Sequence, residues 1–181
     1  MTDGAGVARL RTAPPIRPLG DADAPAILDV INDAAEAYRG VIPDDCCPEP
    51  YMPAAELAAE MREMRFLGWN EGVLAGVMAS QRVGDATLIR HAYVRPGHQG
   101  QGIGSALLEQ LLRDAAPGPV LVGTWAAARW AIRFYERRGF VLRADGDALL
   151  RRYWHIPDRQ RKLSVVLALE RAVPTPPARE R

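Results

Sequence analysis

The sequence has few of the residues on which metal sites and disulfide frameworks depend. Its 181 residues include two cysteines, which are adjacent, at Cys46 and Cys47. Neighbouring cysteines form a strained disulfide of little use, so this content predicts a reducing, cytoplasmic location. The three histidines, His91, His98 and His155, have no paired spacing with cysteine or with one another, so no metal site is predicted.

The sequence also lacks a long hydrophobic run and a surplus of one charge. There is no run of 18 apolar residues, and residues 1–18 lack the apolar segment of a signal peptide. Lys and Arg total 23 against 22 Asp and Glu, which gives a formal net charge of +1. We therefore expect neither a membrane nor a nucleic-acid partner. Three local basic clusters remain, at residues 137–138, 151–152 and 159–162, and each is typical of a solvated face.

The length and the 48% hydrophobic content suit one domain, which we place at residues 16–170. Residues 1–15 are expected to be flexible, and residues 171–181 to be a disordered tail. Apolar side chains at steps of three and four predict a helix over residues 24–38, capped by Asp21. Further helices are expected over 54–65, 102–115, 127–138 and 148–154, and strands over 16–19, 66–70, 73–81, 87–94, 120–124, 140–143 and 163–169.

The most informative segment is residues 94–108, where an apolar strand enters a glycine-rich turn and then a helix. Gly100, Gly102 and Gly104 remove the Cβ atoms that would keep a ligand away from the backbone. The first N–H groups of the helix have no partner within it, and the helix dipole favours an anion at that end. This pattern predicts a phosphate-binding turn; a tight strand-to-helix turn without a ligand is the alternative.

The spacing of this turn separates known phosphate loops. A Walker loop ends in Gly-Lys-Ser/Thr, but here Ser105 follows Gly104 directly and the turn has no lysine. A dinucleotide loop has its third glycine one residue later and an acidic residue about 20 positions on. Residues 120–124 contain no acidic residue.

The turn resembles instead the Gln/Arg-x-x-Gly-x-Gly/Ala signature of the GNAT superfamily of acyl-CoA-dependent N-acetyltransferases, which Gln99 to Gly104 match. Residues 131–140 are similar to the second family motif, Ala-x-x-Phe-Tyr-x-x-x-Gly-Phe. The resemblance implies an α/β (α+β) fold: a single GNAT-like domain with a mixed, mostly antiparallel sheet of six to seven strands. About four helices would flank the sheet, with a short extra helix near the C-terminus.

The resemblance implies that acetyl-CoA is the cofactor, with its pyrophosphate in the turn and its pantetheine arm along a free edge of the preceding strand. One basic cluster could then meet the 3′-phosphate. Many family members have an Asn where this chain has Ala128; Trp130 could take over that contact, or could be a core residue. The predicted cofactor-binding residues are Ala92, Tyr93, Val94, Gln99, Gly100, Gln101, Gly102, Ile103, Gly104, Ser105, Trp130 and Phe134.

Two residues are predicted to be catalytic. Tyr135 matches the family tyrosine that lies beside the thioester sulfur and protonates the leaving thiolate; ordinary helix packing is the alternative. Many members have a Glu on the strand before the turn, but residues 87–92 contain no carboxylate. His91 is the one titratable base there, and it either accepts the amine proton, directly or through water, or packs against a sheet neighbour.

The acceptor is expected between the first two helices, where aromatic and acidic residues suit a small primary amine. The predicted substrate-binding residues are Tyr38, Asp44, Glu49, Tyr51 and Trp154. A solvated acidic loop is the alternative for Asp44 and Glu49, and anchoring of the extra helix is the alternative for Trp154. We thus predict acetyl transfer to a small-molecule amine, or a peptide, in a ternary complex. A silent acyl-CoA-binding module, a larger acyl group and a hydroxyl acceptor stay open, as does a homodimer formed through the C-terminal strand.

Overall fold

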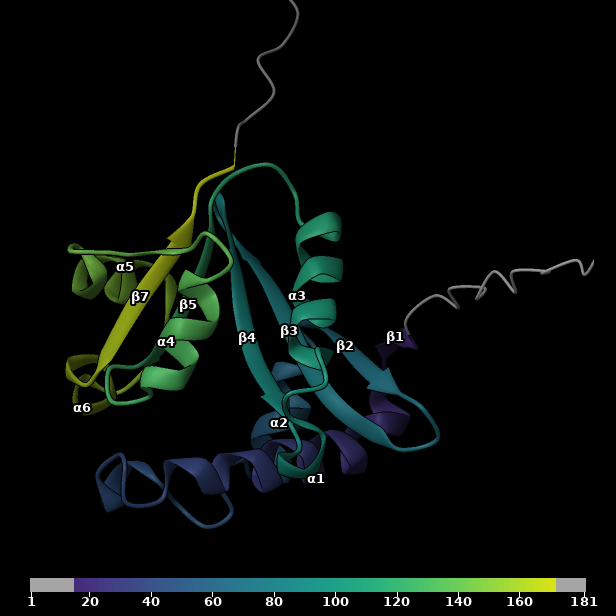
Figure 1. Cartoon of the computed structure of the whole chain (residues 1–181). Coiled ribbons are helices and arrows are strands. Elements are labelled where there is room, and N and C mark those ends of the chain that lie inside the picture. Colours follow the sequence, from purple (N-terminus) through teal and green to yellow (C-terminus); the bar gives the residue numbers. More distant parts are fainter. Residues whose placement is uncertain (1–14, 172–181) are drawn as a thin grey trace, which may run out of the picture.

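The computed structural model describes residues 15–171. Seven strands form one sheet in the order β1-β2-β3-β4-β5-β7-β6 (Figure 1). The pair β4–β5 is parallel, and the other five neighbouring pairs are antiparallel. This confirms the predicted mixed, mostly antiparallel sheet. The expected flexible N-terminus and disordered tail lie outside the described residues, except for Pro15 and Arg171.

The elements follow the predicted order, with shifts at their ends. The strands are β1 (Ile16–Leu19), β2 (Arg65–Asn70), β3 (Leu74–Val83), β4 (Ala86–Val94), β5 (Val120–Trp125), β6 (Val141–Leu142) and β7 (Ser164–Leu169). The α-helices are α1 (Ala24–Ala35), α2 (Ala54–Glu60), α3 (Ile103–Asp114), α4 (Arg129–Glu136), α5 (Gly146–Tyr153) and α6 (Asp158–Lys162). Helix α6 was not predicted, because its residues stand out in the sequence only as a basic cluster. Within residues 15–171, no helix has the length and apolar character needed to cross a bilayer.

Helices cover both faces of the sheet. On one face, α3 and α4 pack against the strands through Leu107, Leu108, Leu111 and Ile132. On the other face, α1 and α2 bury Ile27, Ile31 and Leu57 against β2 and β3, and α5 buries Leu150 against β5 and β7. The predicted stripe of α1 is buried in full. Each fully buried leucine or isoleucine contributes roughly 1.5–3 kcal/mol to the fold.

The start of the first helix differs from the prediction. Asp21 does not cap it; Asp21–Asp23 form a short 3-10 turn before α1. The carboxylate of Asp23 accepts the backbone N–H of Gly20 at 3.0 Å and makes two bonds, of 2.6 and 3.0 Å, with the guanidinium of Arg17. Asp23 is better placed than Asp21 to stabilise the start of this segment, because its carboxylate reaches both a free backbone N–H group and a cation.

The parallel strands β4 and β5 separate along their length. Their register pairs are Thr87–Val120, Leu88–Leu121 and Ile89–Val122, and none follows among the described residues. Figure 1 shows the two strands side by side at one end and apart at the other. The second half of β4 therefore has a backbone edge that faces an opening in the sheet. This is the free strand edge that the resemblance implies for the pantetheine arm.

A β-bulge lies on β4 beside this opening. Tyr93 pairs with Val77, but Arg90 pairs with Ala79, so β4 has one extra residue. His91 has a φ of +47°, in the left-handed region that non-glycine residues rarely occupy. A bulge re-aims side chains, and here the side chains of Arg90 and His91 both reach α2.

Residues 143–163, which contain α5 and α6, are inserted between strands β6 and β7. Strand β7 lies between β5 and β6 and pairs with both. Strand β7 is therefore an inner strand, although β6 pairs in register with only Leu167 and Ala168, and its pairing across subunits stays a prediction.

Candidate active site

The glycine-rich turn has the geometry of an anion site. Gly100 and Gly102 have φ values of +77° and +83°, and a Cβ atom added to either would lie in open space. Gly102 is the N-cap of α3, and no side chain among the described residues caps this helix. The backbone N–H groups at the start of α3 are thus left for a ligand.

The glutamines of the turn brace it without covering these N–H groups. The Nε2 of Gln99 donates to the carbonyl of Val94 at 3.1 Å, and the Nε2 of Gln101 donates to the carbonyl of Gly97 at 3.4 Å. Both bonds link the turn to the chain just before it. A turn held by its own side chains and free of Cβ atoms at its mouth fits a diphosphate.

A cavity of about 460 Å³ extends from this turn between α3 and α4. It is lined by most of the predicted cofactor-binding residues: Ala92, Tyr93, Val94, Gln99, Gly100, Gly102, Ile103, Gly104, Ser105, Trp130 and Phe134. Gln101 is the one predicted residue that does not line this cavity. We refer to this space as the cofactor cleft.

One of the three basic clusters lies at the cofactor cleft. Arg137 and Arg138 both line it. The guanidinium of Arg138 lies 3.8 Å over the ring of Phe134, donates to its carbonyl at 2.7 Å and also hydrogen-bonds the hydroxyl of Ser105. Partial burial lowers the pKa of Arg138, which nevertheless remains a cation. The cluster thus places positive charge beside the first turn of α3.

Trp130 is not a core residue. Its side chain is 47% exposed, and its ring stacks on Tyr38 with centroids 5.9 Å apart, at the edge of the cofactor cleft. Ala128, where many relatives have an asparagine, is fully buried. Of the alternatives that the sequence left open, the structure supports a ligand-facing position for Trp130.

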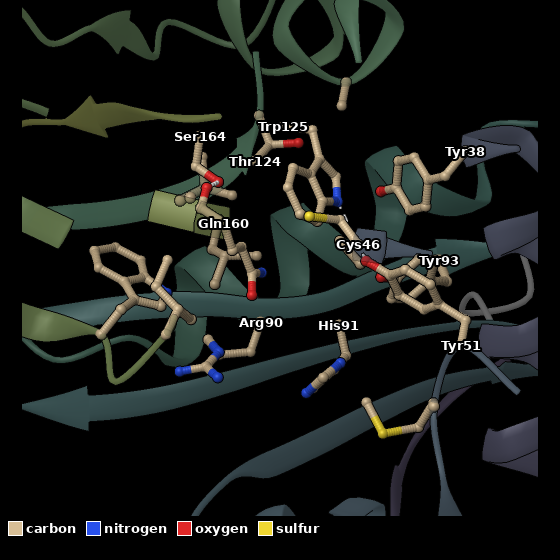
Figure 2. Close-up of a pocket in the computed structure, with 18 of the residues that line it drawn as sticks. Tyr38, Cys46, Tyr51, Arg90, His91, Tyr93, Thr124, Trp125, Gln160 and Ser164 are labelled. Atoms are coloured by element: carbon tan, nitrogen blue, oxygen red, sulfur yellow. Dashed lines mark hydrogen bonds between the residues drawn. The ribbon is translucent and has the colours of Figure 1, made fainter. Parts of the chain in front are cut away.

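A second cavity, of about 370 Å³, lies in the gap between β4 and β5 (Figure 2). We call it the acceptor cavity. Tyr38, Tyr51 and Trp154 line it as predicted, whereas Asp44 and Glu49 do not. Those two carboxylates are exposed, and Glu49 forms an ion pair with Arg39. The solvated-loop alternative describes them better.

The carboxylates of the acceptor cavity are Glu56 and Glu60 of α2, which the sequence analysis did not identify. The Oε2 atom of Glu60 lies 2.5 Å from Nε2 of His91, and neither buried atom has another hydrogen-bond partner among the described residues. Oε1 of Glu60 lies 3.3 Å from the guanidinium of Arg90. Glu56 and Glu60 are four residues apart, which places them on one face of a helix. This spacing is the feature of the sequence from which the pair could have been predicted.

The charges of this cluster act on one another. Burial raises the pKa of the Glu60 carboxyl, but the hydrogen bond from His91 and the charges of His91 and Arg90 outweigh it, so the pKa is lowered overall. Glu60 is therefore ionised at neutral pH. The ring of His91 stacks on Phe66, at 5.7 Å, and on Tyr93, at 6.5 Å. His91 is therefore held by two aromatic rings and by a carboxylate at one nitrogen.

Tyrosines surround the inner end of the acceptor cavity. Tyr38 and Tyr51 have ring centroids 5.5 Å apart, and the Tyr51 hydroxyl accepts the indole N–H of Trp125 at 3.2 Å. Burial raises the pKa of Tyr38, Tyr51 and Tyr93 above the ordinary phenol value. Figure 2 shows these side chains converging on one side of the cavity, opposite Gln160. All of them stay neutral, so this end is polar but uncharged.

The two cavities share five lining residues, namely Tyr38, Ala92, Tyr93, Ala131 and Tyr135. The side chain of Tyr135 is 3% exposed and packs edge-on against Phe134 and Phe140, at 5.0 and 5.3 Å. Burial raises its pKa well above the ordinary value, so the hydroxyl keeps its proton at physiological pH. Tyr135 is thus packed in the core and also lines the junction of the two cavities, and its catalytic role stays a prediction.

Comparisons with known proteins agree with this architecture. Residues 63–142 match the family model of an acetyltransferase (GNAT) domain. The PaiA N-acetyltransferase of Thermoplasma acidophilum, solved with coenzyme A, superposes with a TM-score of 0.68 at 15% identity over 88% of this chain and 100% of that chain. The ribosomal-protein-S18-alanine N-acetyltransferase of Escherichia coli has a TM-score of 0.61 at 21% identity, over 86% of this chain and 92% of that chain.

An acetyltransferase from Staphylococcus aureus is similar at a TM-score of 0.64 and 15% identity, over 87% of this chain and 99% of that chain. No curated protein sequence gives a significant match. The opened sheet, the uncapped glycine turn and the two joined cavities define a GNAT fold. The match of residues 63–142 to the acetyltransferase (GNAT) domain model and the shared fold confirm the resemblance predicted from the two motifs.

Proposed function

We propose that this protein transfers an acetyl group from acetyl-CoA to the primary amine of a small molecule, directly, within a ternary complex. The observation that carries the proposal is the junction of the cofactor cleft and the acceptor cavity at Ala92, Tyr93 and Tyr135. Two ligands that enter from the two cavities meet there, which is the arrangement that direct transfer needs.

Acetyl-CoA supplies the acetyl group as a thioester, whose carbonyl carbon bonds to the amine nitrogen as the C–S bond breaks. The N–H groups at the start of α3 and the Arg137–Arg138 cluster hold its phosphates. The backbone edge of β4 near Ala92 and Tyr93 pairs with the pantetheine arm and polarises the thioester carbonyl.

His91, or a water that it holds, accepts the proton of the amine. Because Nε2 of His91 faces the carboxylate of Glu60 at 2.5 Å, the neutral ring carries its proton on Nε2 and keeps a lone pair on Nδ1. Glu60 is then a positioning residue, which fixes the tautomer and stabilises the imidazolium that forms. It takes the place of the strand carboxylate that the sequence lacks.

Tyr135 donates to the leaving sulfur. A phenol pKa above that of a thiol makes full proton transfer to the thiolate uphill, and burial of Tyr135 increases this difference. The hydroxyl therefore stabilises the developing thiolate as a hydrogen-bond donor, and a proton released by the amine completes the neutral thiol. Its raised pKa keeps it in the donor form at every physiological pH.

Thiol release from acetyl-CoA across a panel of amines tests the proposal. We expect release that depends on the amine and yields an N-acetyl product by mass spectrometry. Calorimetric binding of coenzyme A with no release for any amine would instead support the silent acyl-CoA-binding module. Longer acyl-CoA donors and alcohol acceptors in the same assay decide the acyl group and the acceptor atom. The cytoplasmic location, and a homodimer formed through the C-terminal strand, also remain proposals.

A further inference from the structure

We propose that the acceptor is a compact aminocarboxylate, with its carboxylate bound by Arg90 and its amine beside Glu60 and His91. This inference rests on the proposed function and names the substrate class of the same site. It follows from the presence of one guanidinium and two carboxylates along one wall of a cavity whose other side chains are aromatic, apolar or polar without an acidic or guanidinium group.

The guanidinium of Arg90 has unused donors. Its side chain is 19% exposed, and it donates to Oε1 of Gln81 at 3.2 Å and to Oε1 of Glu60 at 3.3 Å, two long bonds out of the five N–H groups available. Gln81 is neutral, and Glu60 shares its charge with His91. A carboxylate is the group that best matches the remaining N–H fork.

The nearby carboxylates do not fully offset the burial of this cation. Desolvation lowers the pKa of Arg90, although the charges of Glu60, Glu56 and Glu63 raise it, and the balance is a lowered value. An anion that binds at Arg90 compensates for part of the solvation that the guanidinium loses on burial. The site at Arg90 therefore favours the binding of an anionic group.

The opposite charge lies one side chain away. Glu60 contacts both Arg90 and His91, and Glu56 lines the same cavity one helical turn before it. An ammonium group beside these carboxylates is stabilised as it binds, and His91 is there to accept its proton. The guanidinium of Arg90 and the neighbouring carboxylates match the two charges of a zwitterion. A simple polyamine fits less well, because it would place a positive group beside the positive charge of Arg90.

The far wall of the cavity limits the size of the ligand. The insertion between β6 and β7 supplies this wall through Leu150, Trp154, His155, Ile156, Pro157 and Gln160. Figure 2 shows Gln160 pointing into the space across from Arg90 and His91. A cavity of about 370 Å³ closed by this insertion accommodates a small molecule better than an extended peptide.

Matched acceptors separate recognition of a carboxylate from general effects of the substitution. Phenylalanine and γ-aminobutyrate are compared with their primary amides, which keep the amine and the shape but lose the negative charge. For wild-type protein we expect a lower KM for at least one acid than for its amide. Arg90→Gln should raise the KM of that acid about tenfold and leave that of the amide within a factor of about two. Arg90→Lys should recover part of the preference.

Arg143→Gln is the matched control, because Arg143 also forms ion pairs, with Asp145 and Glu170, but lines neither cavity. Its KM values should equal those of the wild type. Thermal unfolding shows whether each variant folds. Wild-type preference for the amides, or an equal rise for acid and amide in Arg90→Gln, would overturn the inference and leave the proposed acetyl transfer intact.

Binding of the N-acetylated acid and of its amide, followed by calorimetry with coenzyme A present, tests the same point without turnover. In the wild type, the N-acetylated acid should bind more tightly than its amide. In Arg90→Gln, the acid and the amide should bind equally. If no amine releases thiol, the proposed function fails, and this binding comparison alone decides whether the cavity recognises a carboxylate.

Discussion

Asp45 and Arg159 form a two-point ion pair, with distances of 2.6 and 3.2 Å, between the loop before α2 and helix α6. Each lies next to a residue that lines the acceptor cavity, Cys46 and Gln160 respectively. The bond joins two segments that are 114 residues apart in the chain. It holds the two outer walls of the acceptor cavity together.

Breaking this pair should loosen the acceptor cavity and leave the cofactor cleft unchanged. Because both side chains are more than half exposed, we expect Asp45→Asn to raise the acceptor KM about two- to fivefold, with unchanged affinity for coenzyme A. The difference from wild type should vanish in high salt. Arg151→Gln removes another exposed ion pair, away from both cavities, and should have no effect on KM. An unchanged KM in Asp45→Asn would show that the pair does not shape the cavity.

Removal of the Tyr135 hydroxyl should slow the chemical step. Tyr135→Phe keeps the packing against Phe134 and Phe140, so we expect kcat to fall about 100-fold with little change in coenzyme A affinity. Tyr153→Phe is the control, because its hydroxyl donates to Asp85 at 2.7 Å and the residue lines neither cavity. Steady-state kinetics of both variants decide the matter. Wild-type turnover in Tyr135→Phe would limit this residue to packing.

The His91–Glu60 contact should be visible in the rate of the chemical step. His91→Ala should lose about 100-fold of kcat, because the ring that accepts the amine proton is removed. Glu60→Gln should lower kcat by about tenfold, because the amide cannot stabilise an imidazolium. Unchanged turnover of His91→Ala near neutral pH would remove His91 from the mechanism, and wild-type kcat in Glu60→Gln would remove Glu60.

Gly102 and Gly72 offer a matched test of the phosphate turn. Their φ values are +83° and +86°, and a Cβ added to either meets no atom within 4 Å. Substitution by alanine at either position should therefore cost a similar free energy of unfolding, about 1 kcal/mol. Only Gly102→Ala should weaken coenzyme A binding in calorimetry, on the order of tenfold, because its methyl group enters the cofactor cleft. Equal coenzyme A affinities in the two variants would contradict a ligand at this turn.

The stability that Asp23 provides should depend on pH. Its bonds with Arg17 and with the Gly20 N–H lower its pKa to about 2, below the value near 3.9 expected for the unfolded chain. The contribution is therefore complete above about pH 4 and is lost as the pH falls towards 2. With allowance for solvent screening, Asp23→Asn should lower the free energy of unfolding by about 1 kcal/mol at neutral pH and by less in acid. Urea unfolding of both proteins measures this, and a difference independent of pH would contradict it.

The conformation of the glycine-rich turn and the fold class could be predicted because their signals are local. A positive φ at Gly102 requires glycine, and the stripe of α1 follows from helical periodicity alone. The partner of His91 could not be predicted, because the end of α2 meets β4 only in the tertiary structure. The same holds for the bulge at His91, which sets where that side chain points.

The acidic residues before α2 show the limit of composition as a guide. Asp44 and Glu49 appeared suited to an amine, but both are exposed and line neither cavity. Glu49 pairs with Arg39, and Asp45, between the two, pairs with Arg159. A run of carboxylates in a loop does not reveal which of them turns inward. Glu56 and Glu60 lie on a regular helix, where spacing does carry that information.

The separation of β4 from β5 has a consequence for the molecule as a whole. Within residues 15–171, the short pairing of β4 with β5, over three register pairs, is the one place where the sheet joins its first four strands to its last three. A molecule that lies between the two edges and bonds to both adds cohesion that the polypeptide lacks by itself. The lifetime of the folded chain should therefore rise and fall with the supply of that molecule.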